Sequence, residues 1–245
     1  MYAGVLTAGR VAAEGFQTAY FAVAPYTRYG PHLPLTAGIL IARSFAEAIS
    51  SRIGAFMLPV QPFGTLFEHA EKFNVRVDPG LLYEMVLDIA CNLRRQGFRR
   101  LVLHQGFRGM SILYPLTRHI NADGVIDAAF VNPCDLAESR GGILSGDGNF
   151  HACEAQTSLM LYLHPACVRA DKIRGADFVP DVPPQYLQYK PLSAYCPDGV
   201  WGRPSLADAE KGEKLFRRGV ELSAAAIDEA FAFMDKNGGY AGGPA

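Results

Sequence analysis

The sequence predicts an α/β domain in which a mostly parallel sheet is layered with helices. Short apolar runs of strand length alternate along the chain with longer segments whose apolar residues recur at helical spacing. This alternation is typical of parallel sheets with helical crossovers. The chain of 245 residues is long enough to bury a substantial core in one large domain, and it shows no internal repeat. We therefore expect a single domain over residues 1–245.

The elements of the first half are bounded by proline and glycine. An apolar run over residues 19–23, closed by Pro25, predicts a buried strand, and helical spacing over residues 39–53 predicts a helix. A second short apolar run at 56–60 predicts another strand. Proline in the first turn and glycine after the last turn predict a helix over residues 79–97.

The second half continues the alternation. Residues 101–103 and 125–131 predict two further buried strands, and residues 155–163 predict a helix. The stretch Ser205-Leu206-Ala207-Asp208 resembles a capping box before a long C-terminal helix with an apolar stripe. The end of the chain is thus predicted to pack as a helix against the domain.

Two segments lack periodicity. Residues 174–203 are rich in proline and aromatic residues, and we expect a long ordered loop that covers the site or makes a subunit contact. Residues 237–245 are rich in glycine and alanine and are expected to form a flexible tail.

Composition excludes several classes of protein. Hydrophobic residues make up 49% and charged residues 19%, with a net charge of −1, so we expect neither disorder nor nucleic acid as a partner. No apolar run is long enough to span a membrane, and no secretion signal is evident at the N-terminus. The five cysteines are widely spaced and odd in number, which favours reduced thiols in a cytoplasmic protein over a disulfide framework or a zinc knuckle.

Four sequence blocks, in the same order, resemble the creatininase family of amidohydrolases. They are GPHLPL at 30–35, QGFRGM at 105–110, HACEAQTSLMLYLHP at 151–165 and GRPSLADAEKGEKLF at 202–216. The resemblance implies a three-layer αβα sandwich, hydrolysis of a cyclic amide C–N bond and assembly as a homo-hexamer. Fold resemblance alone does not establish the reaction.

The resemblance also implies two divalent metals held by carboxylates and histidines, and here the sequence departs from the family. Dications need several deprotonated oxygen or imidazole ligands. The residues at the five ligand positions supply almost no negative charge, and they are Thr27, Tyr29, Gly38, Phe107 and Gln156. We therefore predict no metal, no other cofactor and metal-independent chemistry.

Three residues are candidates for acid–base catalysis. His32 lies between prolines and either works near neutral pH or caps backbone groups of its turn. His151 lies near a helix N-terminus, whose dipole favours a neutral imidazole that can act as a base. Glu154 follows one turn later and either orients His151 or stabilises the helix.

Two arginines and four other residues are candidates for substrate binding. Arg28 and Arg108 lie in the two site loops, where a guanidinium suits an anionic group; the alternative is that both point to solvent or pair with acids. The others, which could equally be packing or terminating residues, are Tyr29, His104, Gln105 and Trp201. Cys153 is expected to pack as a small apolar residue, and His69 is expected at the surface or in a helix.

Three functions remain open from the sequence. The first is a metal-independent enzyme that hydrolyses or rearranges a small cyclic amide, lactam or keto substrate of anionic character. The second is a hydrolase with one rearranged metal, held by His32, His104, His151 and Glu154. The third is a non-catalytic homologue with a binding or structural role.

Overall fold

The computed structural model confirms an α/β fold around a parallel sheet. It describes residues 6–69, 73–106, 108, 112–139, 141–146 and 149–238. The strands run in the order β2-β1-β3-β4, every neighbouring pair being parallel. Their bounds are Thr18–Val23 for β1, Phe56–Met57 for β2, Arg100–Gln105 for β3 and Asp127–Val131 for β4. Phe21 of β1 pairs with Leu103 of β3, which pairs with Phe130 of β4.

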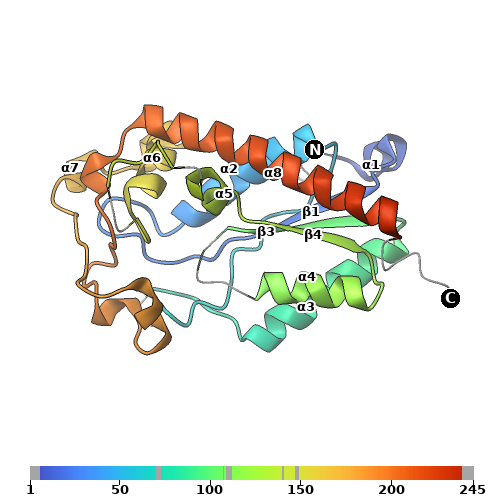
Figure 1. Ribbon diagram of the computed structural model, residues 1–245, viewed down its shortest axis with the longest axis horizontal. Coiled ribbons are helices and arrows are strands. Elements are labelled where there is room, and N and C mark those ends of the chain that lie inside the picture. Colours follow the sequence, from blue (N-terminus) through green and yellow to red (C-terminus); the bar gives the residue numbers. More distant parts are fainter. Residues whose placement is uncertain are drawn as a thin grey trace.

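Helices cover both faces of the sheet and complete a three-layer αβα arrangement (Figure 1). One face is covered by α2 (Ala37–Arg52), α5 (Pro133–Ser139), α6 (Glu154–Leu163) and the long α8 (Ala209–Asn237). The other face is covered by α3 (Pro79–Arg95) and α4 (Leu113–Ala122). Two short helices, α1 (Ala8–Glu14) and α7 (Ala170–Ile173), lie at opposite ends of the molecule in Figure 1.

Alternating strand residues build two cores, because successive side chains of a strand point to opposite faces. Tyr20 and Val102 point towards α2, α6 and α8, whereas Phe21 and Leu103 point towards α3 and α4. All four side chains are at most 5% exposed. The sheet is therefore buried on both faces, as in other parallel sheets with helical crossovers.

Several predicted boundaries require correction. The strand expected at 56–60 is paired only at Phe56–Met57, since Pro59 cannot donate a ladder hydrogen bond. The expected capping box is wrong at its first residue: Asp208 is the N-cap of α8 and accepts from the Lys211 backbone N–H at 2.7 Å. Ser205 instead lies in a short 3-10 helix, Pro204–Leu206, and donates to Asp177.

The long loop over 174–203 is ordered by two short 3-10 helices, Pro184–Gln188 and Leu192–Ala194. It has a small core of its own around Leu192, Cys196 and Trp201. It lies at the end of the molecule that also carries α6 and α7 (Figure 1). We call residues 174–203 the cover segment. Of the expected tail, Asn237 ends α8, and residues 239–245 lie outside the described part of the chain.

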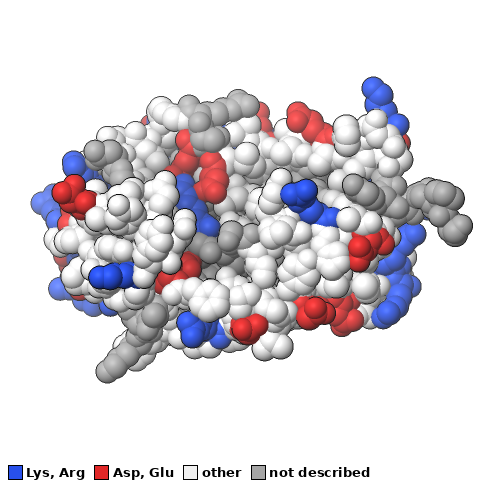
Figure 2. Space-filling model, turned by 60° about the horizontal axis from the view of Figure 1, so that its bottom comes forward, with Lys and Arg blue, Asp and Glu red and all other residues white. Residues whose placement is uncertain are grey.

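Surface charge is mixed on the face that Figure 2 shows. Small blue and red groups are interspersed with broad uncharged areas on this face. Across the residues that the structure describes, no helix combines the length and the apolar character that crossing a membrane requires.

Candidate active site

The carboxyl ends of β1 and β3 bring most of the candidate residues to one edge of the sheet. The loop after β1 carries Arg28, Tyr29 and His32, and β3 ends with His104 and Gln105. In parallel sheets, sites form in the loops beyond this edge. The segment before α6 and the end of the cover segment close the same region through an antiparallel bridge between residues 151 and 201.

His151 lies at the centre of this region. Its side chain is held by a hydrogen bond of 2.7 Å from Nε2 to the Arg28 carbonyl oxygen. The ring stacks on Tyr29 with centroids 4.5 Å apart, and it is 1% exposed. Because a carbonyl oxygen only accepts, this bond places a proton on Nε2 and leaves Nδ1 as the basic nitrogen of the neutral ring.

His69 is a site residue that the sequence analysis missed. It was expected at the surface or in a helix, but it is 3% exposed and its ring lies edge-on to His151, with centroids 4.6 Å apart. Burial and the nearby Arg28 charge lower the pKa of His69 to about 3. The residue belongs to an irregular connection between β2 and α3, where no periodicity could indicate its direction.

His32 and His104 are buried imidazoles with separate partners. The Nε2 atom of His32 is 2.9 Å from the Thr157 hydroxyl of α6, and burial lowers the pKa of His32 to about 4, against the opposing effect of Asp177. The Nδ1 atom of His104 is 3.1 Å from the Tyr20 hydroxyl, and burial lowers its pKa to about 3. Both contacts tie neighbouring elements together.

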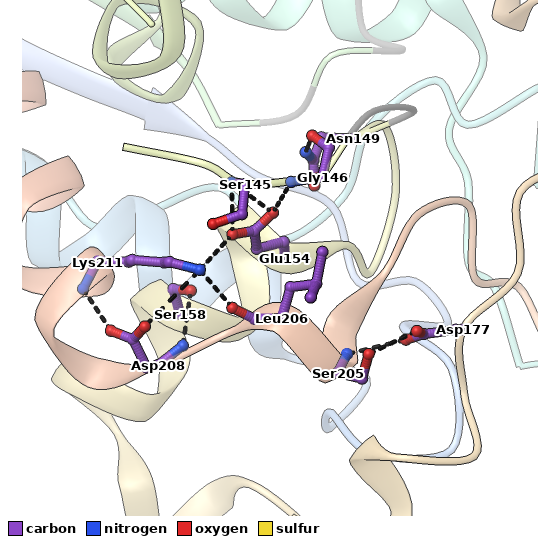
Figure 3. Close-up of polar contacts among 10 residues, drawn as sticks. All are labelled: Ser145, Gly146, Asn149, Glu154, Ser158, Asp177, Ser205, Leu206, Asp208 and Lys211. Carbon is purple, nitrogen blue, oxygen red and sulfur yellow. Dashed lines mark hydrogen bonds and ion pairs between the residues drawn. The ribbon is translucent and has the colours of Figure 1, made fainter. Parts of the chain in front are cut away.

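Glu154 does not contact His151 in this arrangement but lies in a buried ionic network (Figure 3). Its carboxylate, 0% exposed, accepts from the backbone N–H groups of Ser145 at 2.9 Å and Gly146 at 2.8 Å. Lys211 of α8 donates its Nζ to the same carboxylate at 2.7 Å and to the Leu206 carbonyl at 2.6 Å. The carboxylate therefore links the start of α6 to residues 145–146 and to α8, which is a structural role that neither alternative for Glu154 described.

Arg108 is also engaged by the protein. Its guanidinium donates to Asp135 at 2.5 Å and to Glu138 at 2.6 Å, and a third donor reaches the Asn149 carbonyl at 2.9 Å. Burial acts to lower the pKa of Arg108, but the Glu138 and Asp135 carboxylates outweigh it and raise the pKa. Two carboxylates compensate the charge, which matches the alternative of pairing with nearby acids.

Arg28 is the arginine that keeps an unused donor. Its Nη2 donates to the Pro197 carbonyl of the cover segment at 2.9 Å, while its Nε is buried and has no hydrogen-bond acceptor in the described part of the chain. The guanidinium packs so closely on Gly199 that a Cβ there would lie 2.9 Å from Nε.

Trp201 is 1% exposed and packs against Phe150, so it serves as a core anchor of the cover segment.

The residues at the family's ligand positions do not fit a pair of dications. The Tyr29 hydroxyl lies where a side chain at position 38 would begin, so that a Cβ built on Gly38 would overlap it. Thr27 donates its hydroxyl to Asn74 at 2.8 Å. Phe107 lies outside the described residues. Within the described ranges, no three His, Cys, Asp or Glu side chains gather in a way that could hold a metal ion.

The tight contact between Tyr29 and Gly38 gives a testable prediction. Gly38→Ala is expected to destabilise the protein by about 1–3 kcal/mol, because the new methyl group overlaps the Tyr29 hydroxyl. Tyr29→Phe removes that hydroxyl, so the alanine should cost clearly less in this background. Gly9→Ala in α1, where no atom lies within 4 Å, is the matched control and should cost nothing. Urea unfolding measures all four variants, and equal costs of Gly38→Ala in both backgrounds would contradict the contact.

The layered fold and the loops at the carboxyl edge define an α/β protein with a candidate site beyond the ends of its parallel strands. The model of the family described as "Creatininase: Creatinine amidohydrolase" matches residues 7–227. The chain therefore belongs to the creatininase family.

Individual relatives and solved structures agree with this assignment. The chain is 27% identical over 212 residues to a mycofactocin precursor peptide peptidase of Mycobacterium ulcerans, covering 79% of this chain and 78% of the relative. It is 27% identical over 227 residues to a creatinine amidohydrolase of Pseudomonas putida, covering 83% and 86%. A crystal structure of creatinine amidohydrolase superposes with a TM-score of 0.78 at 26% identity, over 94% of this chain and 97% of that one.

Proposed function

We propose that this chain is a metal-independent, amidohydrolase-like member of the creatininase family that acts on a small cyclic amide, lactam or keto metabolite with an anionic group. One observation carries the metal-independent part: Tyr29 fills the space in which a side chain at position 38 would reach the site, so a metal-ligating carboxylate has no room there. Neither the phenol nor glycine supplies the charge that a dication requires.

Within this proposal, His151 is the acid–base group. Its Nε2 proton is fixed by the Arg28 carbonyl, so Nδ1 is the nitrogen that can take a proton from the attacking water or the substrate. Arg28 binds the anionic group of the substrate, because its buried Nε–H is a donor that no described residue uses. These two residues come from the loops that the resemblance identifies as site loops.

A substrate can reach these groups only when the cover segment moves. Tyr29, His151 and Trp201 are each 1% exposed. The contact from Arg28 to the Pro197 carbonyl is a single hydrogen bond near the surface, and a substrate carboxylate offers Arg28 a stronger, charge-assisted partner. Binding and displacement of the Pro197 contact are therefore coupled in the proposal.

The experiment combines metal analysis with turnover. Protein purified without chelator is expected to hold less than about a tenth of an equivalent of metal. Creatinine and the anionic lactam 5-oxoproline are assayed with and without chelator. Turnover of an anionic ring should not respond to chelator, and His151→Ala should reduce it at least about tenfold, equivalent to about 1.4 kcal/mol of barrier. Two equivalents of tightly bound metal, or full activity of His151→Ala, would contradict the proposal.

A second candidate function, a non-catalytic binding or structural homologue, is favoured by a specific observation. Glu154, Arg108 and His32 each have protein partners that account for their presence in the site loops. In that case the same assays show no turnover, while a thermal shift with an anionic lactam decides between ligand binding and a purely structural role. The homo-hexamer implied by the resemblance and the cytoplasmic location stay predictions.

A further inference from the structure

Three strained backbone positions cluster around the candidate site. A positive φ is unfavourable for residues other than glycine. Among the described residues, the only non-glycine residues with positive φ are Leu66 at 26°, Phe73 at 70° and Ala152 at 48°. Such strain persists only where the surrounding structure imposes it, and it concentrates at functional sites. The location of these three residues therefore indicates which groups the fold holds in place.

Each strained residue is adjacent to, or hydrogen-bonded to, a residue of the region around His151. Ala152 directly follows His151. The carbonyl of Leu66 accepts a hydrogen bond of 3.1 Å from the His69 backbone N–H. Phe73 precedes Asn74, whose side-chain oxygen accepts from the backbone N–H of Arg28 at 3.0 Å, and the Arg28 carbonyl is the partner of the His151 ring.

We propose that His69 is a positioning residue of this site, whose ring fixes the orientation of His151 and thereby the nitrogen of His151 that carries the proton. The ring of His69 lies edge-on to His151 at 4.6 Å and an interplanar angle of 61°. Tyr29 stacks on His151 at 4.5 Å and 30°. These two rings have different inclinations, and together with the hydrogen bond to the Arg28 carbonyl they restrain the orientation of the His151 imidazole.

The inference deepens the proposed function, since it concerns the imidazole that we propose as the acid–base group. Edge-on aromatic contacts depend on geometry, because the positive edge of one ring faces the electron-rich face of the other. Burial and the Arg28 charge keep His69 neutral near neutral pH, with a pKa of about 3. His69 therefore adds no repulsive charge beside His151.

The test measures the Nε2 proton of His151 by NMR on histidine-labelled protein at neutral pH, and it needs no substrate. The resonance is assigned by its loss in His151→Gln. In the native protein we expect a slowly exchanging proton, since Nε2 donates to the buried Arg28 carbonyl. His69→Leu should speed this exchange at least about tenfold, whereas His69→Phe, which keeps the ring edge, should retain most of the protection.

Leu82→Ala is the control for loosening of the fold, since Leu82 is 1% exposed in the core on the opposite face of the sheet. It should lower the Tm while leaving the His151 resonance unchanged. The proposal is overturned if His69→Leu leaves the exchange unchanged, or if Leu82→Ala accelerates it equally. Should His69→Leu not fold, His69→Gln replaces it with the same criterion. Absence of turnover in the assays above would contradict the proposed reaction, whereas the exchange rate of the His151 Nε2 proton would still test the role of His69.

Discussion

Glu154→Ala is expected to lower the free energy of unfolding by about 3–5 kcal/mol, because the substitution removes the nearer charge partner of the Lys211 ammonium and leaves only the Asp208 carboxylate, 3.7 Å away. The carboxylate is completely buried, and the lysine side chain is 18% exposed. Two backbone N–H groups, of Ser145 and Gly146, lose their acceptor as well. Removal of one partner from a buried pair costs more than the pair itself contributes, since the remaining charge stays poorly solvated.

A double-mutant cycle with Lys211→Met makes the prediction specific. The cycle uses Glu154→Ala and Lys211→Met, singly and together. The double variant lacks both charges, so its cost should fall well below the sum of the costs of the two single variants. Glu210→Ala is the matched control, since Glu210 pairs with Lys214 on the exposed side of the same helix and should have little effect. Urea unfolding supplies the free energies. Additive costs would show that the ion pair does not determine the stability of this region.

The Glu154 network also shows what the sequence could and could not predict. The blocks HACE and AEKG carried the family resemblance. The helix after HACE was predicted within one residue, whereas the capping box expected at Ser205 lies three residues before Asp208, the N-cap of α8. The contact between Glu154 and Lys211 was not predictable, because the two residues are 57 positions apart and no sequence pattern indicates that they pair. The contact gives both blocks a structural role in this chain.

Regular elements were predictable and irregular ones were not. Burial on both faces made β1 and β3 continuous apolar runs, and α3 shows its apolar stripe directly. His69 was misplaced because its direction is imposed by the connection around Leu66 instead of by helical or strand periodicity. The sequence also could not decide whether Arg108 binds substrate or pairs with acidic residues, since Asp135 and Glu138 come close to it only in the tertiary fold.

Acidification below about pH 6.5 is expected to destabilise the protein steeply, because three buried histidines resist protonation. The pKa values of His69 and His104 are lowered to about 3 and that of His32 to about 4, in each case mainly by burial. Between these values and the ordinary pKa of about 6.5, the unfolded chain binds protons that the folded chain does not. Stability is therefore present above about pH 6.5 and is lost as the pH falls towards 4.

The size of the effect follows from the number of protons. Each such histidine approaches a slope of about 1.4 kcal/mol per pH unit once its unfolded form is protonated. Three therefore approach about 4 kcal/mol per unit and contribute about 5 kcal/mol between pH 6.5 and pH 5. Glu138 acts in the opposite sense, because burial raises the pKa of its carboxyl group even though Arg108 partly offsets this. One opposing carboxyl group reduces the slope without reversing it.

The test is urea unfolding at a series of pH values between about 7 and 5. His104→Phe keeps the ring against Tyr20 but removes one titrating group, so the slope of stability against pH should fall by about a third. Leu103→Ala, in the same strand and fully buried, should lower stability at every pH with the native slope. A slope that His104→Phe leaves unchanged would contradict the prediction and would mean that His104 gains its proton in the folded protein, with Nδ1 then donating to the Tyr20 hydroxyl oxygen.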